Sequence, residues 1–157
     1  MYSIQHAEWT ALSEIQQLQL KALLLEADPS WQQISTYLLQ SNLFFILNDQ
    51  AQIIAQLCLF RTDDQAEIKN LAVDSRYKKQ GLAKALIQFA IENTKDQNIQ
   101  TLWVKTGNSS LDQLALYQKC GFRLSHIEPN VFTDYPEAIY ENGIRCLDQV
   151  VLCLKFE

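Results

Sequence analysis

The stretch that decides the fold runs from Ala66 to Glu92 and reads AEIKNLAVDSRYKKQGLAKALIQFAIE. Its first part, residues 68–73, is rich in apolar residues and stops at Asp74 and Ser75, which is typical of a strand that ends in a turn. Its last part repeats apolar residues at helical spacing: Leu82, Ala85, Leu86, Phe89 and Ala90. This change of period predicts a strand, a turn and an amphipathic helix in direct succession.

The turn between this strand and helix carries lysines and a glycine. We expect it to bind a phosphate or pyrophosphate group through Lys78, Lys79, Gln80, Gly81, Leu82, Ala83 and Lys84. Glycine lets the backbone approach a ligand closely, and the first turn of a helix offers unpaired N–H groups to an anion. The alternative is an ordinary connection with a solvated basic turn. The sequence has neither G-x-x-x-x-G-K-[ST] nor G-x-G-x-x-G, which excludes a P-loop and a dinucleotide fold of that type.

The composition favours one domain over residues 1–157. With 48% hydrophobic and 20% charged residues, the chain can bury a sizeable core but has little room for a second one. The net charge of −5 argues against a nucleic-acid partner, so the lysines at 69, 78, 79 and 84 are a local exception. They favour a small anionic ligand over a polymer.

The chain begins MYSIQHAEWT, without a basic segment followed by an apolar one, and no apolar run reaches membrane-spanning length. We therefore expect a soluble, cytoplasmic protein without a membrane partner. The four cysteines, at positions 58, 120, 146 and 153, form no C-x-x-C pair, and two of them lie in apolar, strand-like runs. Buried free thiols are therefore expected, and neither a disulfide nor a metal site is.

The remaining elements follow from periodicity and turn residues. Further strands are expected at 2–7, 43–47, 53–60, 101–106, 122–127 and 147–156. Thr10 should cap a first helix. The inward stripe of that helix is expected to be Ile15, Leu18, Ala22 and Leu25. Asp28 as N-cap and Pro29 as first helical residue should begin a second helix. Ser109 with Asp112 should cap a last helix that spans residues 110–119.

A second motif, NSSLDQLALYQKCGF from Asn108 to Phe122, completes a pattern. The chain resembles the GNAT superfamily of N-acetyltransferases, whose cofactor motif [RQ]-x-x-G-x-[GA] corresponds to Lys78-x-x-Gly81-x-Ala83 after the strand end Leu71-Ala72-Val73-Asp74. The other signature, N-x-x-[AS]-x-x-[LF]-Y-x-x-x-G-F, matches at Asn108, Tyr117, Gly121 and Phe122. The chain departs from the family at Lys78, where Arg or Gln is preferred, at Leu111, and by two additional residues after Asn108.

The resemblance implies an α/β (α+β) fold with a mixed, mostly antiparallel sheet of about seven strands and about four helices. It implies transfer of an acetyl group from acetyl-CoA to a primary amine of a small molecule or peptide. Leu71, Ala72 and Val73 would hold the pantetheine arm and the carbonyl, and Asn108 or Ser110 would meet that arm. Tyr117 would protonate the leaving thiolate, although a half-buried core tyrosine is the alternative reading.

The general base and the acceptor site are less defined by the sequence. Glu67 is the first candidate for the base, with Glu137, Glu141 and His126 after it. The segment 128–145 is predicted to be irregular, and we expect Tyr135, Glu137 and Glu141 to bind a protonated amine there. A solvated crossover is the alternative for this segment.

Two other readings of the whole chain stay open at this point. One is a catalytically silent acyl-CoA-binding module, and the other is an interaction module on the same fold. The sequence does not identify the acceptor amine. It also leaves the oligomeric state open, and a homodimer is among the states that the resemblance implies.

Overall fold

The computed structural model describes residues 2–157. The helices are α1 (Glu14–Ala27), α2 (Trp31–Ser35), α3 (Leu82–Lys95) and α4 (Leu111–Lys119), with 3-10 turns at Trp9–Ala11, Leu38–Gln40 and Ser75–Tyr77. The strands are β1 (Ile4–Glu8), β2 (Ser41–Leu47), β3 (Ile53–Arg61), β4 (Gln65–Val73), β5 (Thr101–Gly107), β6 (Arg123–Glu128), β7 (Tyr140–Glu141), β8 (Ile144–Arg145) and β9 (Gln149–Lys155).

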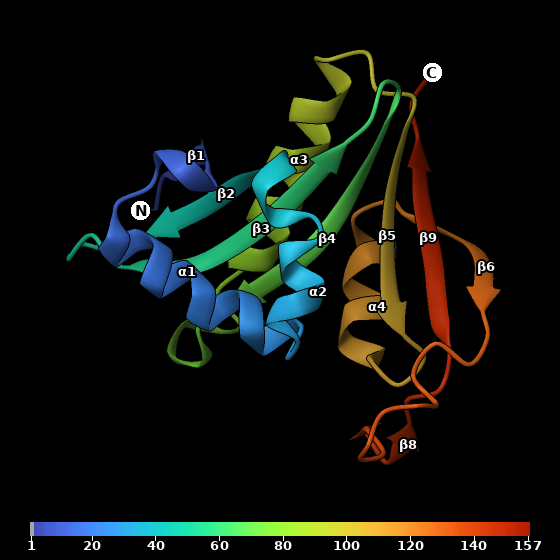
Figure 1. Ribbon diagram of the computed structural model, residues 1–157. Helices are drawn as coiled ribbons and strands as arrows, with labels where there is room; N and C mark the ends of the chain where they lie inside the picture. Colours follow the sequence, from blue (N-terminus) through green and yellow to red (C-terminus); the bar gives the residue numbers. More distant parts are fainter. Residues whose placement is uncertain (1) are drawn as a thin grey trace.

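Seven of these strands form one mixed sheet in the order β1-β2-β3-β4-β5-β9-β6. All neighbours are antiparallel except β4 and β5, which run parallel because α3 connects them. Figure 1 shows this sheet and the separate β7–β8 hairpin near its lower end. The predicted fold, a mostly antiparallel seven-stranded sheet with four helices, is confirmed.

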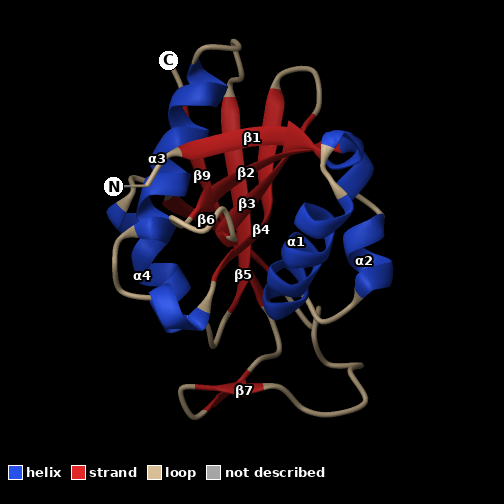
Figure 2. Ribbon diagram, turned by 90° about the vertical axis from the view of Figure 1, so that its left-hand side faces the viewer, coloured by secondary structure: helices blue, strands red, loops and turns tan. Residues whose placement is uncertain are grey.

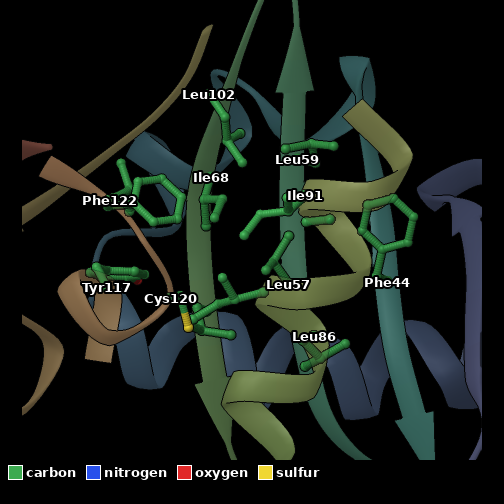
Figure 3. Close-up of a cluster of buried hydrophobic side chains, with 14 of the residues drawn as sticks. Phe44, Leu57, Leu59, Ile68, Leu86, Ile91, Leu102, Tyr117, Cys120 and Phe122 are labelled. Atoms are coloured by element: carbon green, nitrogen blue, oxygen red, sulfur yellow. The ribbon is translucent and has the colours of Figure 1, made fainter. Parts of the chain in front are cut away.

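The sheet is covered on both faces, but by different helices and over different strands. Figure 2 shows α3 and α4 on one side and α1 and α2 on the other. The buried apolar residues form two clusters. The first core packs α3 and Tyr117 against the central strands. In Figure 3, Tyr117 and Phe122 lie on one side of Ile68, while Leu86 and Ile91 of α3 lie on the other. The second core lies under α1 and α2 and includes Cys58.

The predicted strand-turn-helix unit is present at α3. The helix begins after Gly81, whose φ of 80° is left-handed, and it buries Leu82, Leu86 and Ala90 together with Ile87, Ile91 and Thr94. Ala85 is exposed and does not belong to the buried face, which corrects that part of the prediction. Each fully buried Leu or Ile contributes about 1.5–3 kcal/mol, so this face holds α3 on the sheet.

The first helix differs from its prediction. Its cap is Ser13 rather than Thr10. The Ser13 hydroxyl accepts from the Gln16 backbone amide, and the Gln16 side-chain oxygen accepts from the Ser13 backbone amide, which forms a capping box. Ile15 and Leu18, expected inside, are 70% and 72% exposed. The buried side chains of α1 are Leu20, Leu23 and Leu24. The choice of cap moves the helix start by three residues, and the start alone does not decide which face packs inward.

Two other predicted helix caps are wrong. Ser30, not Asp28, caps α2 through the Gln33 amide, and the Asp28 carboxylate instead accepts from the Ser30 amide at 3.0 Å. Pro29 therefore precedes the cap and is not the first helical residue. At α4 the residue before the helix is Ser110, whose side chain makes no capping bond, and the buried hydroxyl of Ser109 has no hydrogen-bond partner within the described residues.

The segment 128–145 is less irregular than expected, because β7 and β8 form a short hairpin within it. All four cysteines are free and buried, as predicted. Among residues 2–157, the helices are too short or too polar to cross a membrane.

Candidate active site

The parallel strands β4 and β5 separate after a short contact. They pair over Gln65–Ile68 and Thr101–Val104, whereas the rest of β4 pairs with β3 alone. Figure 1 shows the two strands close together where they begin and well apart where they end. The backbone edge of Leu71, Ala72 and Val73 that faces β5 therefore has no strand partner. Unpaired N–H and C=O groups on this edge can hydrogen-bond an extended ligand, as an added strand would.

The turn that follows β4 offers a second set of free backbone donors. Within the part of the chain that the structure describes, no backbone acceptor is found for the amides of residues 78–84, and the first bonded amide is that of Ala85, on Gly81 at 3.0 Å. Lys79 and Gly81 both have positive φ, 63° and 80°. Left-handed residues in such a turn form a concave nest of N–H groups that suits an anion.

The residues before this turn hold it in place. The Asp74 carboxylate accepts from the backbone amide of Arg76 at 2.9 Å and forms an ion pair with its guanidinium, also at 2.9 Å. These bonds keep the pKa of Asp74 below its usual range. Apart from its chain neighbours, no heavy atom of residues 2–157 lies within 4 Å of where a Gly81 Cβ would stand. The predicted phosphate-binding residues 78–84 are thus assembled at one helix end with open space before them.

Tyr117 lies on α4 and is 3% exposed. Its ring packs edge-on against Phe122, with centroids 5.8 Å apart. Burial raises the pKa of the Tyr117 hydroxyl above its usual value, so the side chain stays protonated. The hydroxyl makes no side-chain hydrogen bond to another described residue, which leaves its proton available to a ligand. Burial confirms that Tyr117 is part of the core, and its role as a proton donor stays a prediction.

Glu67 lies on the opposite face of the sheet from the first core, beside Phe60 on β3 and Trp103 on β5. Its carboxylate forms an ion pair with Lys69 at 3.3 Å. A β-bulge at Lys69 interrupts the register between β3 and β4, so that Asn70 faces α1 as well. Glu67, the first candidate for the general base, lies next to the point where β4 and β5 separate.

The Asn108 side chain links the end of β5 to the segment that precedes β9. Its side chain donates to the Arg145 carbonyl at 3.0 Å and accepts from the amides of Leu147 and Asp148 at 2.8 and 2.9 Å. Its amide group is thereby occupied within the protein. Of the two residues that were expected to meet the pantetheine arm, Ser110 is the one with spare hydrogen-bonding capacity, since its hydroxyl makes one bond, to Glu141 at 3.1 Å.

The candidate acceptor residues are not gathered in one place. Glu141 accepts a hydrogen bond from the Ser110 hydroxyl, and the neighbouring Asn142 donates to the Ser109 carbonyl at 2.9 Å. These two bonds hold the β7–β8 hairpin against the start of α4. Tyr135 packs on Phe132, and Glu137 is exposed. Figure 2 shows the hairpin below the sheet, with the segment before it reaching toward the side of α1 and α2.

Sequence reasoning missed a buried polar network beside Glu67. The Gln56 amide donates to the Asn70 carbonyl oxygen at 2.6 Å, and the Asn70 amide donates to the Leu24 carbonyl and to the Tyr37 hydroxyl. Burial raises the pKa of Tyr37 above its usual value. Gln56 is the single polar residue in the apolar run 53–60 of β3, and this break in the pattern is the signal that could have revealed the network.

Comparison with known proteins agrees with this geometry. The model of the acetyltransferase (GNAT) family matches residues 2–122. The uncharacterized N-acetyltransferase YvbK of Bacillus subtilis is 41% identical over 138 residues, which are 87% of this chain and 88% of that protein. The solved structure of a Bacillus subtilis acetyltransferase in complex with CoA has a TM-score of 0.90 at 36% identity, over 100% of both chains. A GNAT family acetyltransferase from Elizabethkingia anophelis with acetyl-CoA bound has a TM-score of 0.87 at 35% identity, over 99% of this chain and 98% of that one.

The chain therefore belongs to the GNAT acetyltransferase family. The resemblance read from the two motifs is confirmed, and so is the expected class of enzyme, an acetyl-CoA-dependent N-acetyltransferase.

Proposed function

We propose that this protein transfers the acetyl group of acetyl-CoA to the primary amine of a small molecule or peptide. The observation that carries the proposal is the combination of an unpaired β4 edge at residues 71–73 with the nest of free amides at residues 78–84. A ligand with a long polar arm and a pyrophosphate matches both features along one continuous path. The two solved relatives with CoA or acetyl-CoA bound support this assignment.

In the proposed reaction, the amine nitrogen attacks the thioester carbonyl and the C–S bond breaks. The amine must lose a proton, and we assign this step to the Glu67 carboxylate, directly or through a water. The thiolate that leaves takes the proton of the Tyr117 hydroxyl, and the second proton that the nitrogen loses on forming the amide restores this hydroxyl. Backbone N–H groups on the free edge of Leu71 to Val73 would stabilise the oxyanion. Residues 78–84 would bind the pyrophosphate.

The proposal is tested by incubating the protein with acetyl-CoA and a panel of amines while free thiol is measured. We expect thiol release that depends on the amine. Glu67→Gln should lower kcat/KM by about a hundredfold at neutral pH, because the general base is lost. The loss should shrink as the pH approaches the pKa of the amine, since a neutral amine needs no base. Glu92→Gln, an exposed change on α3, serves as the control. A loss that is equal at every pH would remove the role of base from Glu67.

The acidic segment before and within the β7–β8 hairpin gives a separate prediction for the acceptor. We propose that Tyr135, Glu137 and Glu141 attract the protonated amine. Glu137→Gln and Glu141→Gln should raise the KM for the amine, more at low ionic strength, and leave the KM for acetyl-CoA unchanged. Glutamine keeps an oxygen that can accept from Ser110, so the second change removes charge without removing that bond. Wild-type amine kinetics in both variants would contradict this role.

A further inference from the structure

None of the described helices covers one half of the sheet on the side of α1 and α2. On this side α1 packs on β3 and β4, and Figure 1 shows β5, β9 and β6 uncovered. The strand register places a set of aromatic and charged side chains here. We name as the open face the residues Glu67, Lys69, Trp103, Lys105, His126 and Glu128. This face adjoins the point where β4 and β5 separate.

The open face contains two half-buried cations, and each is held by a carboxylate. The Lys105 ammonium lies 3.3 and 3.4 Å from the two oxygens of Glu128, and its side chain is 33% exposed. Lys69 lies 3.3 Å from Glu67 and over the rings of Tyr37 and Phe60, at 5.9 and 5.7 Å from their centroids. An ammonium has three N–H donors, so Lys105 retains donors for a further anion.

Trp103 provides a flat surface between these charges. Its indole N–H is already bonded to Gln65 at 2.7 Å, and its ring meets that of His126 edge-on, with centroids 6.4 Å apart. The indole therefore has a fixed orientation, and its role toward a ligand is packing rather than hydrogen bonding.

The register sets the spacing between Glu67 and Lys105. Glu67 pairs with Trp103, and Lys105 follows two residues later on the same face. Two residues along a strand span about 6.7 Å and neighbouring strands lie about 4.8 Å apart, so the two Cα atoms are roughly 8 Å apart. Side chains that extend from these positions can reach two groups of one small molecule.

We propose that the acceptor is a free amino acid, whose amine meets Glu67 and whose carboxylate meets Lys105. The proposal rests on the proposed acetyl transfer and specifies its substrate class. A second ammonium on the acceptor would be repelled by Lys69 and Lys105, whereas a carboxylate gains a charge-assisted hydrogen bond in a partly dry site. Apolar or flat parts of the amino acid would lie on Trp103.

The test measures product binding, which does not require turnover. N-acetylphenylalanine and its neutral analogue N-acetylphenylalaninamide are titrated by calorimetry into the protein saturated with CoA. We expect the acid to bind about tenfold more tightly than the amide, as one charge-assisted hydrogen bond implies. Equal affinities, tighter binding of the amide, or no binding of either would overturn the proposal.

Variants locate the effect on the open face. Lys105→Met should abolish the preference for the acid while the amide still binds, and Lys95→Met, an exposed change at the far end of α3, should keep the preference. If Lys105→Met fails to fold, Glu128→Gln releases Lys105 from its partner and should alter the ratio of the two affinities. A preference unchanged in every folded variant at these two positions would overturn the proposal.

The same protein samples separate this inference from the proposed function. Thiol release with phenylalanine, phenylalaninamide and phenethylamine is measured beside the titrations. If the two amines without a carboxylate are acetylated at least as efficiently as phenylalanine, the result would support the acetyl transfer and overturn the choice of amino acid. No acetylation of any amine, with acid-selective binding retained, would contradict the proposed function and support the carboxylate site.

Discussion

Tyr117→Phe is expected to lower kcat by about a hundredfold or more while the affinity for acetyl-CoA changes little. The hydroxyl is needed when the thiolate leaves and not when the thioester binds, so its removal affects the transition state alone. Stability should be nearly unchanged, because the buried ring remains and the hydroxyl has no side-chain hydrogen bond to lose among the described residues. Single-turnover kinetics and thermal unfolding measure the two effects separately.

Tyr37→Phe is the matched control for this experiment. Tyr37 is also buried, and burial raises its pKa as well, but its hydroxyl accepts from Asn70 at 3.2 Å. Removal of that hydroxyl leaves a buried amide short of one partner, at a cost of about 1–3 kcal/mol. We expect a lower melting temperature for Tyr37→Phe and a lower rate for Tyr117→Phe. Equal turnover of Tyr117→Phe and wild type would leave Tyr117 with a packing role only.

Gly81→Ala is expected to weaken acetyl-CoA binding by at least about tenfold, whereas Gly143→Ala should not. Both glycines are left-handed, with φ of 80° and 74°, and among the described residues other than their chain neighbours no heavy atom lies within 4 Å of either added Cβ. The intrinsic backbone cost of an alanine is therefore similar at the two sites, about 1–2 kcal/mol. The difference between them is that Gly81 stands at the nest of free amides before α3.

Calorimetric titration with acetyl-CoA and with CoA gives this comparison directly. The two variants should lose similar amounts of stability, which shows that the backbone cost is matched. A larger residue at the same position, Gly81→Val, should weaken binding further, because its branched side chain extends into the space where a pyrophosphate would lie. Affinity of Gly81→Ala equal to that of Gly143→Ala would exclude close approach of a ligand at Gly81.

The sequence predicted the unit from β4 to α3 because its signals are local. The apolar run of the strand, the glycine at the turn and the helical spacing after it all lie within 27 residues, from Ala66 to Glu92. The turns that join β2 to β3 and β3 to β4 are local in the same way, and so is the left-handed turn at Gly121, whose φ is 102°. The two motifs were sufficient to identify the family, since they place the nest of amides and the buried tyrosine.

The faces and partners of side chains were decided by the tertiary structure. Simple alternation would place Asn70 with Ile68, toward α3, but the bulge at Lys69 turns it toward α1 and Tyr37. For Asn108, the motif suggested a ligand contact, yet its amide is bonded to a segment 37–40 residues later in the chain.

The acceptor site depended on the same kind of information. The sequence around Lys105 says nothing about Glu128, which lies 23 residues away along the chain. Antiparallel pairing of β5 and β6 with β9 brings the two side chains together on a face that none of the described helices covers. Periodicity along one strand determines which residues alternate, whereas register, bulges and contacts between distant strands determine what each side chain meets, and these arise only when the chain has folded.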